Sequence, residues 1–296
     1  IVGQEQTVDL VLTAILANGH VLIEGVPGVA KTLLARLTAR LIDADFSRVQ
    51  FTPDLMPSDV LGTTVFNMKT NGFDFHQGPI FADIVLVDEI NRAPAKTQAA
   101  LFEVMEERQI SIDGTTHRMG DLYTILATQN PVEQEGTYKL PEAQLDRFLM
   151  KITMDYPSLE EEVNILERHH TNAALVKLDD ITPAITKEEL LSLRAFMNQV
   201  FVDRTLLQYI ALIVQQTRTS KAVYLGASPR ASVAMLQSSK AYALLQGRDF
   251  VTPEDIKFVA PYVLQHRLIL TAEAEMEGYS PVKVTQRLID KVEVPK

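Results

Sequence analysis

Short apolar runs rich in β-branched residues recur through the first half of the chain, and helical patterns lie between them. The runs are residues 20–25, 47–52, 82–89, 122–130 and 147–154. Each is almost continuously apolar, as the buried strands of parallel sheets are. Residues 31–42 and 96–108 instead repeat their apolar positions at helical spacing. This alternation predicts an α/β layer built on a five-stranded parallel sheet.

Two segments do not fit simple alternation. Residues 62–78 have two strand-like arms around Asn71-Gly72, and residues 108–120 have two around Asp113-Gly114. Asn-Gly and Asp-Gly are strong hairpin signals because these residues accept the positive φ that a tight hairpin turn needs. We therefore predict two β-hairpins inserted into the layer.

The second half of the chain loses its strand pattern near Tyr156-Pro157 and becomes helical. Three helix starts are clear: Thr186 with Glu189 in capping-box spacing, Ser228-Pro229 and Thr252-Pro253. We place a boundary here, with an α/β core at residues 1–156 and a smaller all-helical domain at residues 157–296.

The composition removes several classes of chemistry. The net charge of −10 argues against naked nucleic acid as the main partner, because phosphate binding needs a basic surface. The absence of cysteine excludes disulfides, thiolate metal sites and cysteine nucleophiles, and it is compatible with a reducing compartment. No apolar run approaches the roughly 20 residues of a membrane-spanning helix, and no secretory signal is visible. We therefore expect a cytoplasmic protein.

The stretch VLIEGVPGVAKT, residues 21–32, has the form of a strand, a phosphate-binding loop and the start of a helix. Gly25 and Gly28 would let the backbone approach an anion, and Lys31 would reach the β- and γ-phosphates. The Thr32 hydroxyl is suited to Mg²⁺. Ala30 stands where the usual pattern has glycine, so we expect a negative φ at this position.

Polar side chains end two further predicted strands. Asp88 and Glu89 follow residues 84–87, at the sheet edge where parallel sheets bind ligands. Asp88 is suited to Mg²⁺ and Glu89 to polarising a water as general base. Asn130 ends the strand at residues 122–130 and could position the γ-phosphate or the water.

Two arginines complete the candidate set. Arg147 lies at the end of a short predicted helix that begins at Pro141, where a cation suits the helix dipole. Arg230 lies in the first turn of the helix opened by Ser228-Pro229, where a cation opposes the dipole. This unfavourable placement indicates an anionic partner for Arg230.

Together these motifs resemble those of an AAA+ ATPase, and the particular residues within them resemble the MoxR family. In order along nearly the whole chain they are "IVGQE", "GVPGVAKT", "LVDEINRAPAKTQAALFEVMEE", "ATQNPVEQEGTYKLPEAQLDRF" and "GASPRA". Alanine before the Walker A lysine is usual in that family. The resemblance implies a P-loop NTPase core with inserted hairpins, followed by a helical lid domain.

The resemblance also implies roles for single residues in an ATP and Mg²⁺ site. Lys31 and Thr32 match Walker A, Asp88 and Glu89 match Walker B, and Asn130 matches sensor 1. Arg147 matches an arginine finger that acts on the neighbouring subunit's nucleotide, although Arg92 or Arg118 could also face an interface. Arg230 matches sensor 2. The implied nucleotide contacts are Val2, Gly3, Gln4, Gly25, Val26, Pro27, Gly28, Val29, Ala30, Lys31, Thr32, Leu33 and Asp88, and the implied Mg²⁺ ligands are Thr32 and Asp88.

As partners, the resemblance implies a homo-hexameric ring that remodels or activates a protein client, such as one with a von Willebrand A domain. A nucleic-acid motor on the same fold is one alternative, but the hairpins offer only Lys69 in the first and His117 and Arg118 in the second. A magnesium-chelatase-like motor subunit is another alternative. A non-hydrolysing scaffold would be expected to lack Lys31 or Glu89, and the chain has both.

Overall fold

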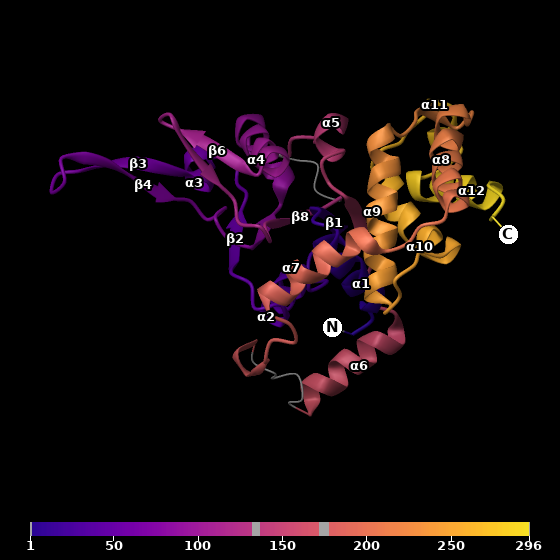
Figure 1. Cartoon of the computed structure of the whole chain (residues 1–296), viewed down its shortest axis with the longest axis horizontal. Coiled ribbons are helices and arrows are strands. Elements are labelled where there is room, and N and C mark those ends of the chain that lie inside the picture. The colour runs from indigo at the N-terminus through magenta and orange to yellow at the C-terminus, as the bar shows by residue number, and fades with distance from the viewer. Residues whose placement is uncertain (1, 132–136, 172–177, 296) are drawn as a thin grey trace. The chain divides into compact units, whose positions relative to one another are not determined.

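The computed structural model describes residues 2–131, 137–171 and 178–295 (Figure 1). Five strands form the central sheet in the order β2-β5-β8-β1-β9. Parallel pairing joins β2 to β5, β5 to β8 and β8 to β1. The strands are β1 Val21–Gly25, β2 Phe46–Gln50, β5 Ile84–Asp88, β8 Thr124–Gln129 and β9 Met150–Met154. The predicted five-stranded parallel sheet is confirmed, and every predicted run supplies one strand.

Burial explains why these strands were recognisable. All five residues of β5 are buried, and so are the first five of β8. Strands covered on both faces read as continuous apolar runs. The helices that follow the first strands are α2 Lys31–Leu41, α3 Pro57–Leu61 and α4 Ala95–Glu107, with α1 Glu5–Leu16 before β1.

Both predicted hairpins are present. Strands β3 Gly62–Asn67 and β4 Gly72–Gln77 pair antiparallel, and Figure 1 shows this hairpin as a long arm. Strands β6 Gln109–Ile112 and β7 Thr115–Arg118 pair around Asp113 and Gly114. Their φ angles of 49° and 79° are both positive, as a two-residue hairpin turn requires.

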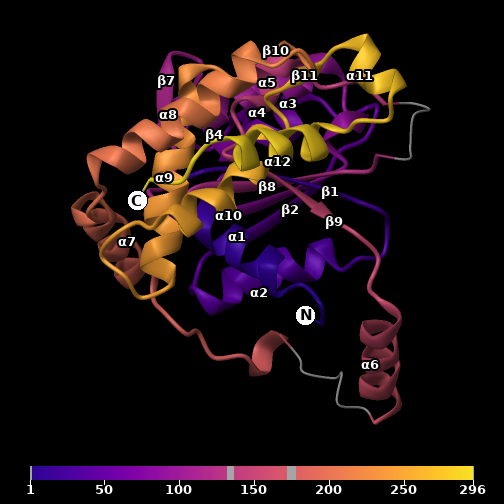
Figure 2. The ribbon, with the colours of Figure 1, turned by 90° about the vertical axis from the view of Figure 1, so that its right-hand side faces the viewer.

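The second half is helical, with one addition. Its helices are α6 Leu159–His170, α7 Lys187–Phe196, α8 Arg204–Thr219, α9 Pro229–Leu245, α10 Pro253–Leu264, α11 Ala272–Met276 and α12 Pro281–Lys291, and the short helix α5 Glu142–Leu145 precedes them (Figure 2). The expectation of an entirely helical second half is wrong in one detail, because β10 Val223–Leu225 and β11 Ile269–Leu270 form a small antiparallel pair. Strands of two and three residues are too short to leave an alternating pattern in the sequence.

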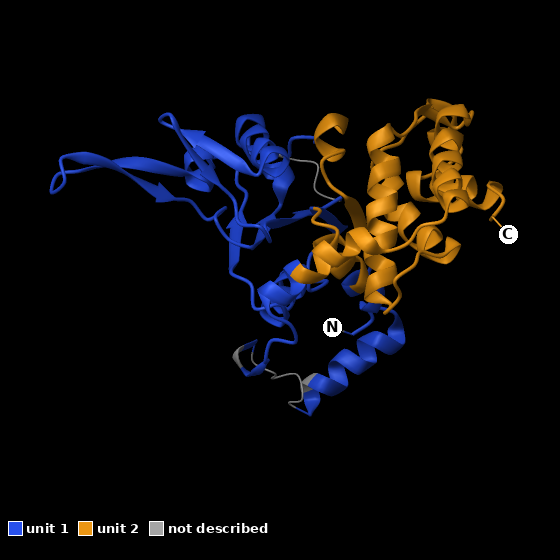
Figure 3. Cartoon of the chain, viewed as in Figure 1, with its two compact units in different colours: residues 1–8, 20–140, 153–191 blue, residues 9–19, 141–152, 192–296 orange. Residues whose placement is uncertain are grey.

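The chain divides into two compact units that interleave along the sequence (Figure 3). Unit 1 comprises residues 1–8, 20–140 and 153–191, and unit 2 comprises residues 9–19, 141–152 and 192–296. Unit 1 therefore carries the predicted phosphate loop and both hairpins, and unit 2 carries the helices α8 to α12. The single cut after residue 156 stays a prediction.

Candidate functional site

The loop between β1 and α2 has the backbone of an anion-binding turn. A Cβ at Gly25 would lie 2.7 Å from the Met154 carbonyl oxygen, so this position cannot carry a side chain without a shift. Gly28 has φ of 90°, which L residues rarely adopt. Pro27 and Gly28 are exposed and Val29 is buried, so the loop is anchored by one side chain and open around its tip.

The negative φ expected at Ala30 is wrong. Ala30 has φ of 64° and ψ of 26°, in the left-handed region, and it forms the N-cap of α2. Alanine has the smallest side chain that can be placed there, at a cost of about 1 kcal/mol. A left-handed residue directly before a helix turns successive N–H groups toward one point, which is the geometry of an anion-binding nest.

Lys31 is the first residue of α2, and its Nζ donates to the Gly25 carbonyl oxygen at 2.6 Å. The ammonium group is thereby folded back over the loop. Thr32 follows it in the first turn, half-buried, and Leu33 is exposed.

Asp88 ends β5 and is held on both carboxylate oxygens. Its Oδ1 accepts from the Thr128 hydroxyl at 3.1 Å, and its Oδ2 accepts from Arg48 Nε at 2.6 Å. The Asp88 side chain is 9% exposed and the Arg48 side chain 51%, so the charge pair lies at the edge of the sheet with the cation on the solvent side.

Glu89 directly follows β5, and its backbone is also left-handed, with φ of 56° and ψ of 52°. Its N–H donates to the Thr128 hydroxyl at 3.0 Å. Its Oε2 accepts from Gln50 Nε2 at 2.7 Å and pairs with Arg92 Nε at 3.0 Å. Arg92, an alternative candidate for the finger, therefore contacts the Glu89 carboxylate of its own subunit.

Sequence reasoning missed three residues that hold the two acids: Arg48, Gln50 and Thr128. Gln50 lies opposite Asp88 in the β2–β5 register, and Thr128 precedes Asn130 by two positions. Gln50 gave only a weak signal, because it is a polar residue inside the predicted run at residues 47–52, and the structure shows that the strand ends at Gln50 itself. Arg48 and Thr128 gave no such signal, since their roles depend on β2 and β8 flanking β5 in the sheet.

The remaining unit 1 candidates are Asn130 and the N-terminal residues Val2, Gly3 and Gln4. Asn130 is buried immediately after β8. Gly3 has φ of 69°, and a Cβ there would come within 2.2 Å of the Glu161 carboxylate on α6. Gln4 accepts from the Thr7 hydroxyl at 2.9 Å, and Val2 is half-buried. Residues 132–136, within the fourth motif of the resemblance, lie outside the described residues.

The two candidate arginines belong to unit 2. The predicted short helix is present as α5, with Pro141 as its N-cap, but Arg147 lies two residues beyond its last residue, and the Arg147 N–H donates to the Gln144 carbonyl oxygen at 3.2 Å. Arg230 is the second residue of α9 and is exposed. Burial lowers the pKa of Arg267, and the positive charge of Arg230 lowers it further, so these two cations are near each other.

Comparison with known proteins agrees with this geometry. Residues 20–150 match the family model described as "ATPase family associated with various cellular activities (AAA)", and residues 215–290 match the AAA lid domain. The chain is 45% identical to "Chaperone MoxR1" of Mycobacterium tuberculosis, with 100% of this chain and 80% of that protein covered. The chain belongs to the MoxR family of AAA+ ATPases. It is also similar to the uncharacterized protein YeaC of Bacillus subtilis, at 48% identity over 99% of this chain and 91% of that protein.

The MoxR-type fold extends to solved structures. A crystal structure of an ATPase candidate from Cytophaga hutchinsonii superposes with a TM-score of 0.91 at 41% identity, covering 100% of this chain and 92% of that one. Family membership supports ATPase activity for the chain. Within the residues described, no helix is both long and apolar enough to cross a membrane.

Proposed function

We propose that this MoxR-family protein hydrolyses ATP with Mg²⁺ and uses the energy, as a homo-hexameric ring, to remodel or activate a protein client. The observation that carries the proposal is the pair Asp88 and Glu89 at the edge of the sheet, positioned by one shared hydroxyl, that of Thr128. The phosphate loop at Lys31 follows β1, and β1 and β5 both flank β8. The cytoplasm, which is compatible with a chain that has no cysteine, is the proposed location.

The donor atoms present fit Mg²⁺. Thr32 offers a hydroxyl and Asp88 a carboxylate, and Mg²⁺ in nucleotide sites typically takes one or two such oxygens together with phosphate oxygens and waters. Among the described residues, no group of three or more His, Cys, Asp or Glu could hold a metal by itself. When bound with the nucleotide, Mg²⁺ would neutralise charge on the β- and γ-phosphates.

The protein's own groups divide the remaining work. Lys31 would leave the Gly25 carbonyl and bind the phosphates, while the N–H groups of the loop cradle them. Glu89 would accept the proton of the attacking water on Oε1, since Gln50 and Arg92 both bind Oε2. Asn130 would orient that water or the γ-phosphate. Arg230 and the Arg147 of a neighbouring subunit would stabilise the charge that develops on the transferring phosphoryl group.

A protein client is supported by the surface of the β3–β4 hairpin. Val65 and Phe66 are each 47% exposed, Phe73 is 73% exposed and Met68 is 89% exposed. Phe66 and Phe73 pack edge to face with ring centroids 5.3 Å apart, so the arm presents an ordered apolar surface. Apolar side chains of this kind favour a protein partner over nucleic acid. The name "Chaperone MoxR1" of a relative points the same way, and a von Willebrand A domain is the client class that the family resemblance suggests.

The test is ATP turnover measured against protein concentration, with sizing of the same samples, for the wild type, Glu89→Gln and Arg147→Ala. We expect turnover per subunit to rise as subunits assemble, to be lost in Glu89→Gln with ATP binding retained, and to stay at the monomer rate in Arg147→Ala. If turnover per subunit did not change with assembly, Arg147 would not act on the nucleotide of a neighbouring subunit. Salt-sensitive DNA binding that stimulates turnover would favour a nucleic-acid motor instead, and stimulation only alongside a chelatase partner would favour a chelatase-like motor subunit.

A further inference from the structure

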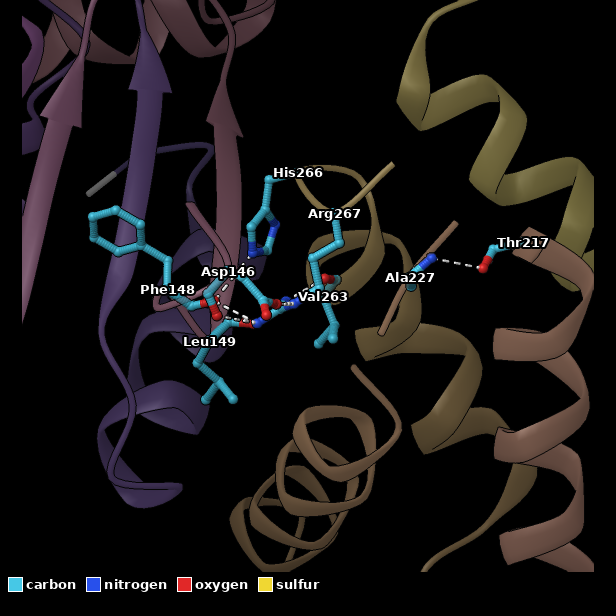
Figure 4. Close-up of polar contacts among 8 residues, drawn as sticks. All are labelled: Asp146, Phe148, Leu149, Thr217, Ala227, Val263, His266 and Arg267. Carbon is cyan, nitrogen blue, oxygen red and sulfur yellow. Dashed lines mark hydrogen bonds and ion pairs between the residues drawn. The ribbon is translucent and has the colours of Figure 1, made fainter. Parts of the chain in front are cut away.

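The backbone on both sides of Arg147 is held by a single buried side chain, Arg267, which is 4% exposed (Figure 4). Arg267 Nε donates to Asp146 Oδ1 at 2.6 Å, and Nη2 donates to the Phe148 and Asp146 carbonyl oxygens at 2.7 and 3.2 Å. Nη1 donates to the Leu149 carbonyl oxygen at 3.1 Å and to that of Val263. All five N–H groups of this guanidinium are therefore used.

Two residues preceding Arg267 act on the same stretch of chain. His266 Nε2 donates to the Phe148 carbonyl oxygen at 3.1 Å, and Gln265 Nε2 donates to that of Lys151 at 2.5 Å. We call Gln265, His266 and Arg267 the α10 clamp, because they lie at the end of α10. The clamp fixes the backbone from residue 146 to residue 151, across about 120 residues of intervening sequence.

The chemistry of the clamp is specific to arginine. The planar guanidinium of Arg267 directs its N–H groups toward a carboxylate and several carbonyl oxygens at once, which a lysine ammonium cannot reproduce. Burial lowers the pKa of Arg267, and the hydrogen bond and charge of Asp146 oppose that effect, so the cation is retained by its partner. Phe148 is fully buried, so the segment is held by packing as well as by hydrogen bonds.

We propose that Arg267 is a positioning residue for the arginine finger: by fixing residues 146 to 149, it sets the direction in which Arg147 leaves the subunit. This inference rests on the proposed role of Arg147 in the neighbour's site. A finger must meet a phosphoryl group to within a fraction of an ångström, and a misplacement of about 1 Å costs on the order of a hundredfold in rate. The contacts of Arg267 supply that accuracy at a position that would otherwise be a loop.

The experiment separates the subunit that donates Arg147 from the neighbouring subunit whose site hydrolyses ATP. A trace of wild-type protein is mixed with an excess of Glu89→Gln protein, which cannot hydrolyse ATP itself but can offer its Arg147 to wild-type neighbours. The donor then also carries Arg147→Ala, Arg267→Lys, Asp146→Asn or, as the matched control, Arg248→Lys. Arg248 pairs with the buried Asp255 in the same unit, and its hydrogen bonds among the described residues go to Phe250 and Asp255. Turnover per wild-type site is measured in samples whose sizing profiles match.

With Arg147→Ala donors, turnover per wild-type site should fall to the unassembled rate. Arg267→Lys donors should lower kcat about a hundredfold with KM for ATP unchanged, and Asp146→Asn donors about tenfold, because a neutral amide accepts more weakly than a carboxylate. Arg248→Lys donors should match the parent donor. If Arg147→Ala donors lower turnover per wild-type site and Arg267→Lys donors leave it unchanged, Arg267 is not a positioning residue. If Arg147→Ala donors work as well as the parent, the finger itself is wrongly assigned and the inference falls with it.

Discussion

The hydroxyl of Thr128 is the smallest group on which the geometry of both strand-end acids depends. It donates to Asp88 Oδ1 at 3.1 Å and accepts the Glu89 N–H at 3.0 Å, while Thr128 itself is 2% exposed. Replacing Thr128 by valine keeps the shape and removes only these two hydrogen bonds. We expect this one change to lower both the stability of unit 1 and the rate of hydrolysis.

The size of the effect follows from the two bonds. A hydrogen bond to a carboxylate contributes about 1.5–3 kcal/mol and a neutral one about 0.5–1.5 kcal/mol, so Thr128→Val should cost roughly 2–4 kcal/mol. The loss in the free energy of unfolding also includes strain at Glu89, because the lost hydrogen bond helps to hold the left-handed backbone of Glu89. Thr124 offers a matched control in the same strand, since it is fully buried and its hydroxyl donates once, to the Leu122 carbonyl oxygen at 3.1 Å. Thr124→Val should cost only about 1 kcal/mol.

Urea-induced unfolding of the wild type and the two variants measures the first effect, and steady-state ATP turnover at saturating Mg²⁺ measures the second. We expect Thr128→Val to lose about ten- to a hundredfold in kcat, as misplaced catalytic groups do, and Thr124→Val to keep the wild-type rate. The reasoning would be refuted if the two variants were equally stable, or if Thr128→Val hydrolysed ATP like the wild type.

Three further features of the structure, the Ala30 backbone, the Arg48–Asp88 pair and the buried His266, can each be tested by substitution. Ala30→Gly should raise the free energy of unfolding by up to about 1 kcal/mol, because glycine relieves the positive φ, whereas Ala30→Val should lower it; equal urea midpoints would contradict the backbone assignment. Arg48→Ala should tighten Mg²⁺ binding to the ADP-bound protein a few-fold in calorimetry, an effect that shrinks at high salt because Arg48 is half exposed. Burial and the nearby charges of Arg267 and Lys151 hold the pKa of His266 well below its usual range. The wild type should therefore lose stability as pH falls below about 6.5, where only the unfolded chain takes up the proton, and His266→Gln should lose less over the same window.

Much of the fold was predictable from sequence because its signals are local. Strands β1 and β5 are nearly continuous apolar runs, and the hairpins carry Asn-Gly and Asp-Gly. Capping geometry was equally local: the Thr186 N–H donates to Glu189 Oε2 at 2.8 Å, and Glu189 N–H donates back to the Thr186 hydroxyl at 3.2 Å. Such features involve residues three or four apart and leave a readable pattern.

The parts that escaped prediction depend on contacts far apart in sequence. Thr128 and Asp88 are 40 residues apart, and Arg267 and Asp146 are 121 apart. These pairs can be recognised as contacts only when the order of the strands and the position of the end of α10 are known. The φ of Ala30 escaped for a different reason: the steric rule that disfavours it is correct, but the loop requires that backbone, and a small energetic cost is tolerated there.

The interleaving of the two units has a consequence for how the chain is made. Helix α1 contributes residues 9–16 to unit 2, and its Leu10, Val11, Ala14 and Ile15 are at most 1% exposed. Arg194 donates to the Ile15 carbonyl oxygen at 2.6 Å across 179 residues. At roughly 5–20 residues per second, a ribosome needs about 9–35 s after completing α1 to reach residue 192. Throughout that interval α1 lacks its hydrogen bonds from Arg194 and every other contact with residues 192–296, so it cannot complete its packing until late in synthesis.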